Sequence, residues 1–234
     1  MAYKHGVYTS EVPTSVVPAV NTTAGLPVAF GTAPVHLASE RAQTNKPILC
    51  YSYAEAVQQL GYSKDWAKYT LCEVMYSQFA LYNRGPVVFV NVLDPKTHKK
   101  STSSKNVTVT NKVAKVDAPV LLDTLQIKAS AAGSALIAGS DYEAAYDDDG
   151  VLVITLLDDG TATAASNLTL TYDEIDAAAV DADDIIGGIN VSDGSVKGLE
   201  CLNKVFPITG LVPGIVLAPG WSENPTVAAV MKAK

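Results

Sequence analysis

Charge is distributed very unevenly along this chain of 234 residues. Residues 104–192 hold fifteen of the 24 acidic residues and only four lysines, so this segment has a charge of −11. The rest of the chain has nine acids against thirteen basic residues, a charge of +4. A single continuous domain does not usually divide its charge in this way, and we therefore expect two structural units.

The sequence before residue 104 alternates between strand and helix patterns. The apolar run Lys46–Ser52 predicts a buried strand. Ser52 and Glu55 have the spacing of a capping box, which predicts a helix that ends at Gly61. We therefore expect a strand that leads directly into a short helix.

A longer helix and a second strand are expected next. Apolar and aromatic residues recur every three or four positions from Ser63, the candidate N-cap, to Gly85, which would end the helix. Gly85–Leu93 is a continuous run rich in β-branched residues, which is typical of a strand covered on both faces. Together with the preceding strand and helix, this order predicts an α/β layer.

Residues 104–192 have the pattern of a small β-domain. Short β-prone runs alternate with turn signals, among them Asp149-Gly150 and Asp159-Gly160. This predicts an antiparallel β-sandwich or barrel inserted into the α/β domain, with the polar, basic stretch Asp94–Lys105 as the linker that leads into it.

The α/β pattern resumes after residue 192. Helical spacing returns through Val196 and Val205, Pro213–Gly220 predicts another buried strand, and Asn224-Pro225 begins a helix with an N-cap and a proline in its first turn. Because a resumed α/β sheet needs further strands, we expect the core domain to be incomplete in this chain. The expected fold class is α+β or α/β, and its parts are an extended N-terminal arm at 1–25, the first part of an α/β core domain at 26–103, an inserted acidic antiparallel β-domain at 104–192, and the truncated resumption of the core at 193–234.

The composition argues against several classes of protein. Hydrophobic residues make up 48% and charged residues 18%, which is enough to build a packed core. The formal net charge of −7 argues against a nucleic-acid partner, because phosphate contacts need a basic face. No apolar run approaches the roughly 20 residues of a membrane span, and residues 1–20 lack the pattern of a signal peptide, so we expect synthesis in a cytoplasm.

No cluster of chemically active residues stands out in the sequence. The cysteines are odd in number, far apart and embedded in apolar sequence, which indicates buried, reduced thiols: Cys50, Cys72 and Cys201. Each histidine is isolated, and none has a cysteine or carboxylate at the spacing of metal ligands: His5, His36 and His98. Motifs for nucleophilic catalysis, phosphate loops and dinucleotide binding are missing, so we expect no enzyme, metal or cofactor.

The acidic segment Tyr146–Gly150 resembles a calcium loop at first sight. An EF-hand needs a further acid where Ala145 stands and a closing glutamate, and both are missing. A solvated hairpin turn is therefore the favoured interpretation.

The segment Gly6–Val20 alternates like a strand, but Pro13 and Pro18 interrupt it and no turn brings it back on itself. The N–H and C=O groups of such an arm need another sheet edge to pair with. The side chains offered to a neighbour are those of Val7, Tyr8, Val12, Val16 and Val17. The other hypothesis is a disordered terminus.

Several segments resemble contractile-tail sheath proteins. "GVYTSEVP" resembles the opening of these chains, in which G-V-Y is followed by an acid, here Glu11, and a proline, here Pro13. "LPVAFGTAPV" is similar to the first strand of their core domain, and the paired helices and the strand "GPVVFVNVL" follow in the same order. "VPGIVLAPGWSENPTVAAVM" is similar to the family's strand–loop–helix, and the insertion lies where many sheath proteins have a β-sandwich. Family members continue past this helix and end in a strand lent to a neighbouring subunit, which we do not find here.

The resemblance implies a structural subunit of a contractile tail sheath, which polymerises helically around an inner tube and contracts to drive the tube through a cell envelope. The implied partners are further copies of the chain, the inner tail tube protein, and baseplate and tail-terminator proteins, with no nucleic acid and no membrane insertion. The implied location is the virion tail, after assembly in the host cytoplasm. The arm would be exchanged between subunits through Gly6, Val7, Tyr8, Glu11, Val12, Pro13, Val16 and Val17.

Two other functions remain open from the residues alone. An adhesion or carbohydrate-binding module would use the acidic β-domain, whose tyrosines are Tyr142, Tyr146 and Tyr172. Exposed aromatic pairs in this domain would favour that function. An enzyme fragment is the third hypothesis.

Overall fold

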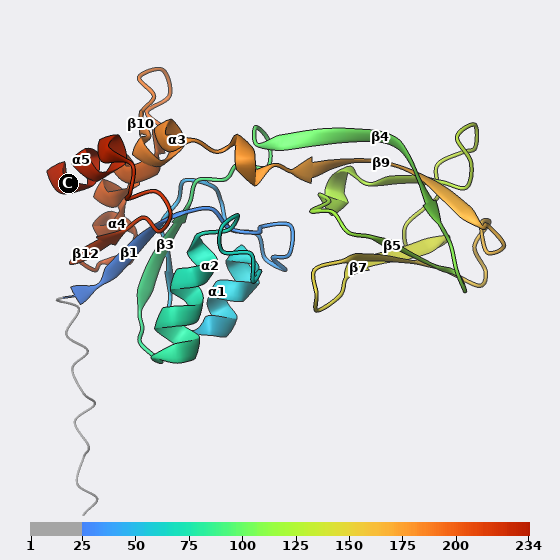
Figure 1. Cartoon of the computed structure of the whole chain (residues 1–234), viewed down its shortest axis with the longest axis horizontal. Helices are drawn as coiled ribbons and strands as arrows, with labels where there is room; N and C mark the ends of the chain where they lie inside the picture. Colours follow the sequence, from blue (N-terminus) through green and yellow to red (C-terminus); the bar gives the residue numbers. More distant parts are fainter. Residues whose placement is uncertain (1–24) are drawn as a thin grey trace, which may run out of the picture.

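The computed structural model describes residues 25–234. All the contact residues assigned to the N-terminal arm lie outside the described part. Residues 25–234 form two groups of sheets that lie end to end along the long axis of Figure 1. We call the group built on the four-stranded sheet the core unit, and residues 99–175 the two-sheet unit.

The core unit is built on a four-stranded sheet in the order β12, β1, β3, β2. Its strands are β1 (Pro27–Gly31), β2 (Ile48–Cys50), β3 (Val87–Asn91) and β12 (Ile215–Leu217). β1 pairs in parallel with both β3 and β12, whereas β2 is antiparallel to β3. All five residues of β3 are buried, as the β-branched run predicts for a central strand.

Two groups of helices pack on the core unit, on opposite sides of β1 and β3 in Figure 1. The first group is α1 (Tyr53–Leu60), α2 (Leu71–Met75) and the π-helix η2 (Tyr76–Leu81). The second group is α3 (Ala182–Ile186), α4 (Leu202–Thr209) and α5 (Pro225–Ala233), with the 3-10 helices η4 (Ala177–Ala179) and η5 (Gly198–Cys201) and the hairpin of β10 (Gly188–Ile189) and β11 (Val196–Lys197).

Helix α1 begins and ends where its sequence predicts. Ser52 Oγ accepts a hydrogen bond from the N–H of Glu55 at 3.2 Å, and the Glu55 carboxylate accepts one from the N–H of Tyr51 at 2.8 Å. Gly61 ends the helix with a φ of 73°. The predicted capping pattern is therefore confirmed.

The second helix starts later than its sequence predicts. Ser63 does not cap it, because its hydroxyl accepts from the N–H of Asp65 in a turn and the α-helix begins at Leu71. The reason is a tertiary contact. The N–H of Thr32 donates to Thr70 Oγ1 at 3.3 Å, and the N–H of Thr70 donates to Thr32 Oγ1 at 3.1 Å. These bonds hold the chain against the end of β1, so the α-helix starts only after Thr70.

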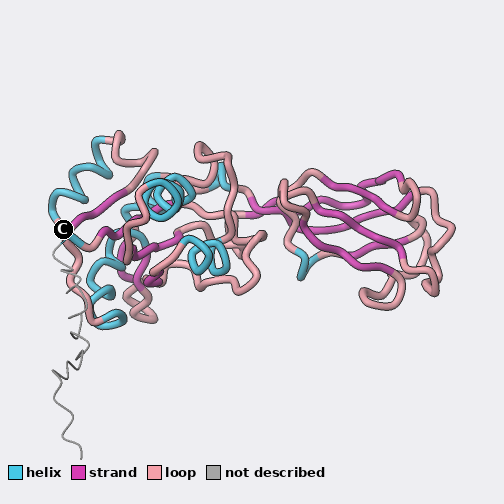
Figure 2. The backbone as a smooth tube through the Cα atoms, turned by 90° about the horizontal axis from the view of Figure 1, so that it is seen from below, coloured by secondary structure: helices cyan, strands magenta, loops and turns pink. Residues whose placement is uncertain are grey.

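The two-sheet unit consists of two three-stranded antiparallel sheets, ordered β4-β9-β6 and β5-β8-β7. The strands are β4 (Lys99–Thr108), β5 (Val113–Val116), β6 (Gln126–Lys128), β7 (Tyr142–Tyr146), β8 (Leu152–Leu156) and β9 (Asn167–Ile175), with the 3-10 helix η3 (Leu122–Thr124) between β5 and β6. Residues such as Ile127 and Leu170 from one sheet and Leu152 and Ile154 from the other are buried in one hydrophobic cluster. The sheets lie beside each other in Figure 2 and share this core.

The acidic segment Tyr146–Gly150 forms the connection between β7 and β8, as predicted. Asp147 Oδ1 accepts hydrogen bonds from the N–H groups of Asp149 at 3.1 Å and Val151 at 2.9 Å. The carboxylate therefore holds the turn itself.

The interpretation of Asp94–Lys105 as a linker is wrong. β4 starts at Lys99, which pairs with Ile175 at the end of β9. Its side chains are mostly exposed, so the segment is as polar as a linker and becomes a strand through its pairing with a distant partner. On the return side, Val180 and Ile185 are buried in the hydrophobic cluster of the core unit.

The strands of the two-sheet unit do not follow the domain limits expected at residues 104 and 192. Residues 99–175 hold eleven acids and six lysines, a charge of −5, against −11 for the expected domain. The difference arises because two further lysines belong to β4 and four aspartates follow β9. The domain limits themselves stay a prediction.

The three cysteines are buried, as expected, and none forms a disulfide in the part of the chain that the structure describes. Burial raises the pKa of Cys50 and Cys72 to about 12 and that of Cys201 to about 11, so these thiols stay protonated near neutral pH. Among residues 25–234, the helices lack the length and apolar character needed to cross a bilayer.

Candidate subunit-contact surface

β12 is the outer strand of the core sheet. It pairs with β1 on one side, and residues 25–234 place no strand on its other side. Ile215 is 49% exposed, and the rest of the strand is half-buried. The expectation of a buried strand at Pro213–Gly220 is therefore wrong. A strand is buried on both faces only when other elements cover it, and among residues 25–234 β12 lies at the edge of the sheet.

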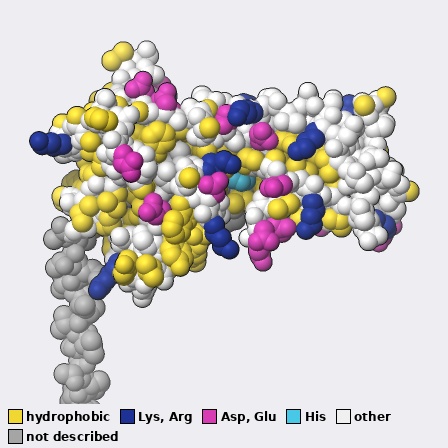
Figure 3. All heavy atoms as spheres, viewed as in Figure 1, with side chains coloured by type: hydrophobic (Ala, Val, Ile, Leu, Met, Phe, Trp, Pro, Cys, Tyr) yellow, Lys and Arg dark blue, Asp and Glu magenta, His cyan; other side chains and the backbone are white. Residues whose placement is uncertain are grey.

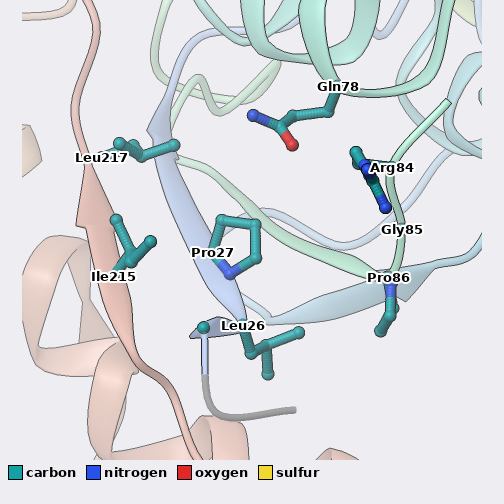
Figure 4. A pocket seen from close by; sticks show the side chains of 9 residues that line it. Leu26, Pro27, Gln78, Arg84, Gly85, Pro86, Ile215 and Leu217 are labelled. Atoms are coloured by element: carbon teal, nitrogen blue, oxygen red, sulfur yellow. The ribbon is translucent and has the colours of Figure 1, made fainter. Parts of the chain in front are cut away.

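A groove of about 270 Å³ lies next to this edge strand. We call it the β12 groove and define it by six lining residues: Leu26, Pro27, Gln78, Arg84, Ile215 and Leu217. Figure 4 shows the Pro27 ring between the side chains of β12 on one side and those of Gln78 and Arg84 on the other. The groove therefore combines an apolar wall from β1 and β12 with a polar rim from η2 and the segment that follows it.

The polar rim of the groove includes a cation that the described chain does not neutralise. Arg84 is exposed, and its side chain forms no ion pair with residues 25–234. The backbone N–H of Arg84 donates to the Gln78 carbonyl at 2.6 Å, which fixes the position of the rim. An arginine at the edge of an apolar groove can recognise an acidic group on a partner.

Apolar side chains gather on the surface of the core unit in Figure 3. The large exposed apolar residues of α4, β12 and the segment between them are Phe206 and Val212, 57% and 63% exposed, with Ile208 and Ile215 at 49% each. A group of large apolar side chains at an open sheet edge is typical of a surface that contacts another protein.

The two-sheet unit lacks the exposed aromatic pairs that a carbohydrate-binding module would present. Tyr142 and Tyr172 are buried in its core, and the hydroxyl of Tyr146 donates to the Val120 carbonyl at 2.6 Å. A cleft of about 790 Å³ lies between the two units, lined by tyrosines and by the β7–β8 turn. Within residues 25–234 no group of histidine, cysteine and acidic side chains is arranged to hold a metal ion.

His98, which is isolated in the sequence, has a carboxylate neighbour in the fold. Its Nδ1 accepts from the N–H of Asp94 at 3.0 Å, and its Nε2 is 3.3 Å from Asp184 Oδ2. The ring thus joins the two chain segments that cross between the units. Sequence spacing could not indicate this pair, because 86 positions separate its members and only the fold brings them together.

The contact residues predicted for the arm lie outside the residues that the structure describes. The β12 groove was not recognised in the sequence. Its residues come from four separate segments of the chain, and the signal that could have indicated it, the apolar run at Pro213–Gly220, suggested burial instead.

Comparison with known proteins identifies a similar phage protein. No protein-family model matches the sequence. The chain is 29% identical over 237 aligned residues to the tail sheath protein of Burkholderia phage BcepMu, and the alignment covers 99% of this chain. It covers 46% of that protein, so the chain spans about half the length of this relative. The chain is thus similar to a phage tail sheath protein, which confirms the resemblance indicated by its motifs.

Proposed function

We propose that this chain is a structural subunit of a contractile phage tail sheath, which polymerises helically around an inner tube and contracts to drive that tube through a cell envelope. The similarity to a tail sheath protein over 99% of the chain is the observation that supports this function most directly. The open edge of β12 and the exposed apolar surface beside it are consistent with a protein that assembles with copies of itself. A structural role requires no catalytic group, metal or cofactor.

We propose for the fold an α/β core domain that holds an inserted antiparallel β-sandwich. The parallel pairing of β12, β1 and β3 supports the first part of this description. The separate hydrophobic cluster of the two-sheet unit supports the second part. We further propose that the two-sheet unit faces outward in the assembly, where solvent screens its acidic surface.

The N-terminal arm is proposed to link subunits as an exchanged strand through Gly6, Val7, Tyr8, Glu11, Val12, Pro13, Val16 and Val17. Such an arm needs a sheet edge that can accept it, and β12 provides one. The other proposed partners are the inner tube protein and the baseplate and tail-terminator proteins. The proposed location is the virion tail after assembly in the host cytoplasm.

Electron microscopy of the purified chain tests this function. We expect regular tubes of constant diameter from the chain, and none after removal of residues 1–20. The melting temperature of the monomer should change little on this removal, because an exchanged strand packs on a neighbour and not on its own chain. A second variant with Val7→Ser and Val12→Ser keeps the length of the arm but removes two apolar side chains, and it should also form no tubes.

Two results would contradict the proposal. A chain that remains monomeric at all concentrations would argue against a sheath subunit. A large fall in melting temperature after removal of residues 1–20 would show that the arm packs on its own subunit, and the strand-exchange account would then be wrong.

A further inference from the structure

The β10–β11 hairpin projects from the core unit near α3 (Figure 1). Gly188 pairs with Lys197 and Ile189 with Val196 across its two short strands. Ile189 is 61% exposed and Val191 97% exposed, so two apolar side chains of the hairpin, two positions apart, face water. Neighbouring apolar side chains on a projecting hairpin are typical of a contact that a partner covers.

The hairpin is held in shape by its own hydrogen bonds. The N–H of Asn190 donates to the Ser195 carbonyl and Asp193 Oδ1 accepts from the N–H of Ser195, both at 2.8 Å. At the base, the N–H of Gly198 donates to Asn45 Oδ1 at 2.9 Å. A hairpin that is already ordered loses little conformational entropy when it binds.

The hairpin and the β12 groove lie at opposite ends of the parallel strands. The groove residues Pro27 and Ile215 are the first residues of β1 and β12. Asn45, which holds the hairpin base, donates its N–H to the carbonyl of Asn91, the last residue of β3, at 2.8 Å. A strand of five residues spans roughly 16 Å. The hairpin base is therefore about one strand length from the Pro27–Ile215 end of the groove, and this separation favours the groove of a second copy as the site for the hairpin.

The two surfaces also have complementary charge. Arg84 supplies a cation at the rim of the groove, and Asp193 supplies a carboxylate near the tip of the hairpin. Hydrogen bonds from Ser195 lower the pKa of the Asp193 carboxyl, so it is ionised at neutral pH. Within residues 25–234 neither side chain forms an ion pair.

We propose that the β10–β11 hairpin of one copy inserts Ile189 and Val191 into the β12 groove of a second copy, with Asp193 beside Arg84. This contact rests on the proposed assembly of identical copies and identifies one of its surfaces. Donor and acceptor are different patches, so the contact is heterologous. Repeated from copy to copy, it produces a ring or an open helical row and not a closed pair. A hairpin tip buries little area, so this contact adds to others in the assembly.

Cross-linking between two batches of the full chain tests the contact. One batch has Val191→Cys at the hairpin tip and the other has Gln78→Cys at the groove, and a short bifunctional maleimide joins cysteines that meet. The native cysteines are buried, so the unmodified chain serves as the unreactive control. We expect a covalent dimer in the mixture and in neither batch alone. A matched control replaces Val191→Cys by Ile137→Cys, an apolar residue of the two-sheet unit that is 65% exposed.

Charge changes make the test specific. Asp193→Asn in the hairpin batch removes the charge but keeps the oxygen that accepts from Ser195, and it should lower the yield of dimer at least fivefold. Asp193→Lys in the hairpin batch combined with Arg84→Glu in the groove batch should restore the yield to within twofold. The proposal is wrong if the Ile137→Cys control gives as much dimer as Val191→Cys, or if Val191→Cys alone forms the dimer. It is also wrong if none of the charge changes alters the yield of dimer.

The outcome is distinguishable from a failure of the proposed function. If the mixture of Val191→Cys and Gln78→Cys chains gives no dimer while the unmodified chain forms regular tubes, the hairpin contact is wrong and the sheath function stands. If the specific cross-link forms but no tubes are seen, the contact stands and the sheath function does not.

Discussion

At the scale of single residues, His36 is a titratable side chain that is buried between aromatic rings. It is 8% exposed, and its ring packs 5.9 Å from the Tyr69 ring and 5.4 Å from the Tyr146 ring, measured between centroids. Its Nδ1 is buried without a hydrogen-bond partner in the described part of the chain. Burial, with smaller contributions from the charges of Arg41 and Lys68, lowers the pKa of His36 to about 3.

This burial predicts a specific dependence of stability on pH. The imidazole of the unfolded chain titrates near pH 6.5, so between about pH 6.5 and 3 the unfolded state binds a proton that the folded state does not. The free energy of unfolding therefore falls as the pH falls through this range. His36→Phe keeps an aromatic ring and removes the titration. The difference in free energy of unfolding between His36→Phe and the unmodified chain should shift in favour of His36→Phe by about 2–3 kcal/mol from pH 7.5 to pH 4.5.

Urea unfolding followed by fluorescence at the two pH values measures this difference. His36→Gln is the matched control, because it does not titrate but keeps a buried polar group. It should show the same loss of pH dependence as His36→Phe. Its free energy of unfolding should be lower than that of His36→Phe at both pH values. Equal pH dependence in all three chains would show that His36 does not contribute.

At the scale of elements, the β10–β11 hairpin depends on two glycines at its base. Gly187 has a φ of 66° and Gly198 a φ of 56°, both in the left-handed region that favours glycine. A Cβ on Gly187 would lie 1.9 Å from the Lys197 carbonyl oxygen, and one on Gly198 would lie 2.4 Å from that of Ile185. The close approach of these backbones sets the direction in which the hairpin projects.

Gly187→Ala should therefore destabilise the core unit by more than the cost of its backbone angle. We expect a loss of roughly 3 kcal/mol or more in the free energy of unfolding, because the backbone must move to remove the clash. Gly194→Ala at the hairpin tip is the matched control. It has a similar φ of 69° but open space around its Cβ, so it should lose about 1 kcal/mol. Chemical denaturation measures both, and equal losses would show that the crowding has no effect.

At the scale of the whole molecule, the chain builds two hydrophobic clusters joined by β4 and β9. Polar contacts lie where the two units join, among them Lys100 with Asp176 at 2.8 Å and His98 with Asp184 at 3.3 Å. Most buried residues of each cluster come from one unit, with Leu121 and Ile175 of the two-sheet unit packed in the first cluster, so each unit has most of what it needs to fold separately.

Removing the two-sheet unit tests this independence. Lys99 and Ile175 lie opposite each other in β4 and β9, so residues 100–174 can be replaced by a short Gly/Ser link. We expect the remaining core unit to be soluble and to melt in one cooperative transition. Removal of 104–192 is the matched comparison. It also deletes Val180 and Ile185 from the first cluster, and burial of such side chains is worth about 2–5 kcal/mol each, so this product should be unfolded or much less stable.

Circular dichroism during heating distinguishes the two deletions. If both products are unfolded, the two units depend on each other and the division into an inserted module and a core is wrong. If both products are equally stable, the residues after β9 do not contribute to the stability of the core unit.

The sequence by itself determined the features that have local causes. The caps at Ser52 and Asn224 and the turn at Asp147 follow from hydrogen bonds between residues no more than four positions apart. The buried strand β3 follows from its unbroken apolar composition. These elements could be predicted because the residues that stabilise them are neighbours in the chain.

Tertiary structure alone decided the rest. The start of α2 depends on Thr32 and Thr70, 38 positions apart, and the polar strand β4 depends on its pairing with β9, whose partner residues are 59 to 76 positions away. The open edge of β12 and the groove beside it depend on which elements cover a strand, and composition does not specify this. An apolar run has the same sequence pattern whether it lies in the middle of a sheet or at its edge, because the free energy of burial depends on the neighbours that the fold supplies.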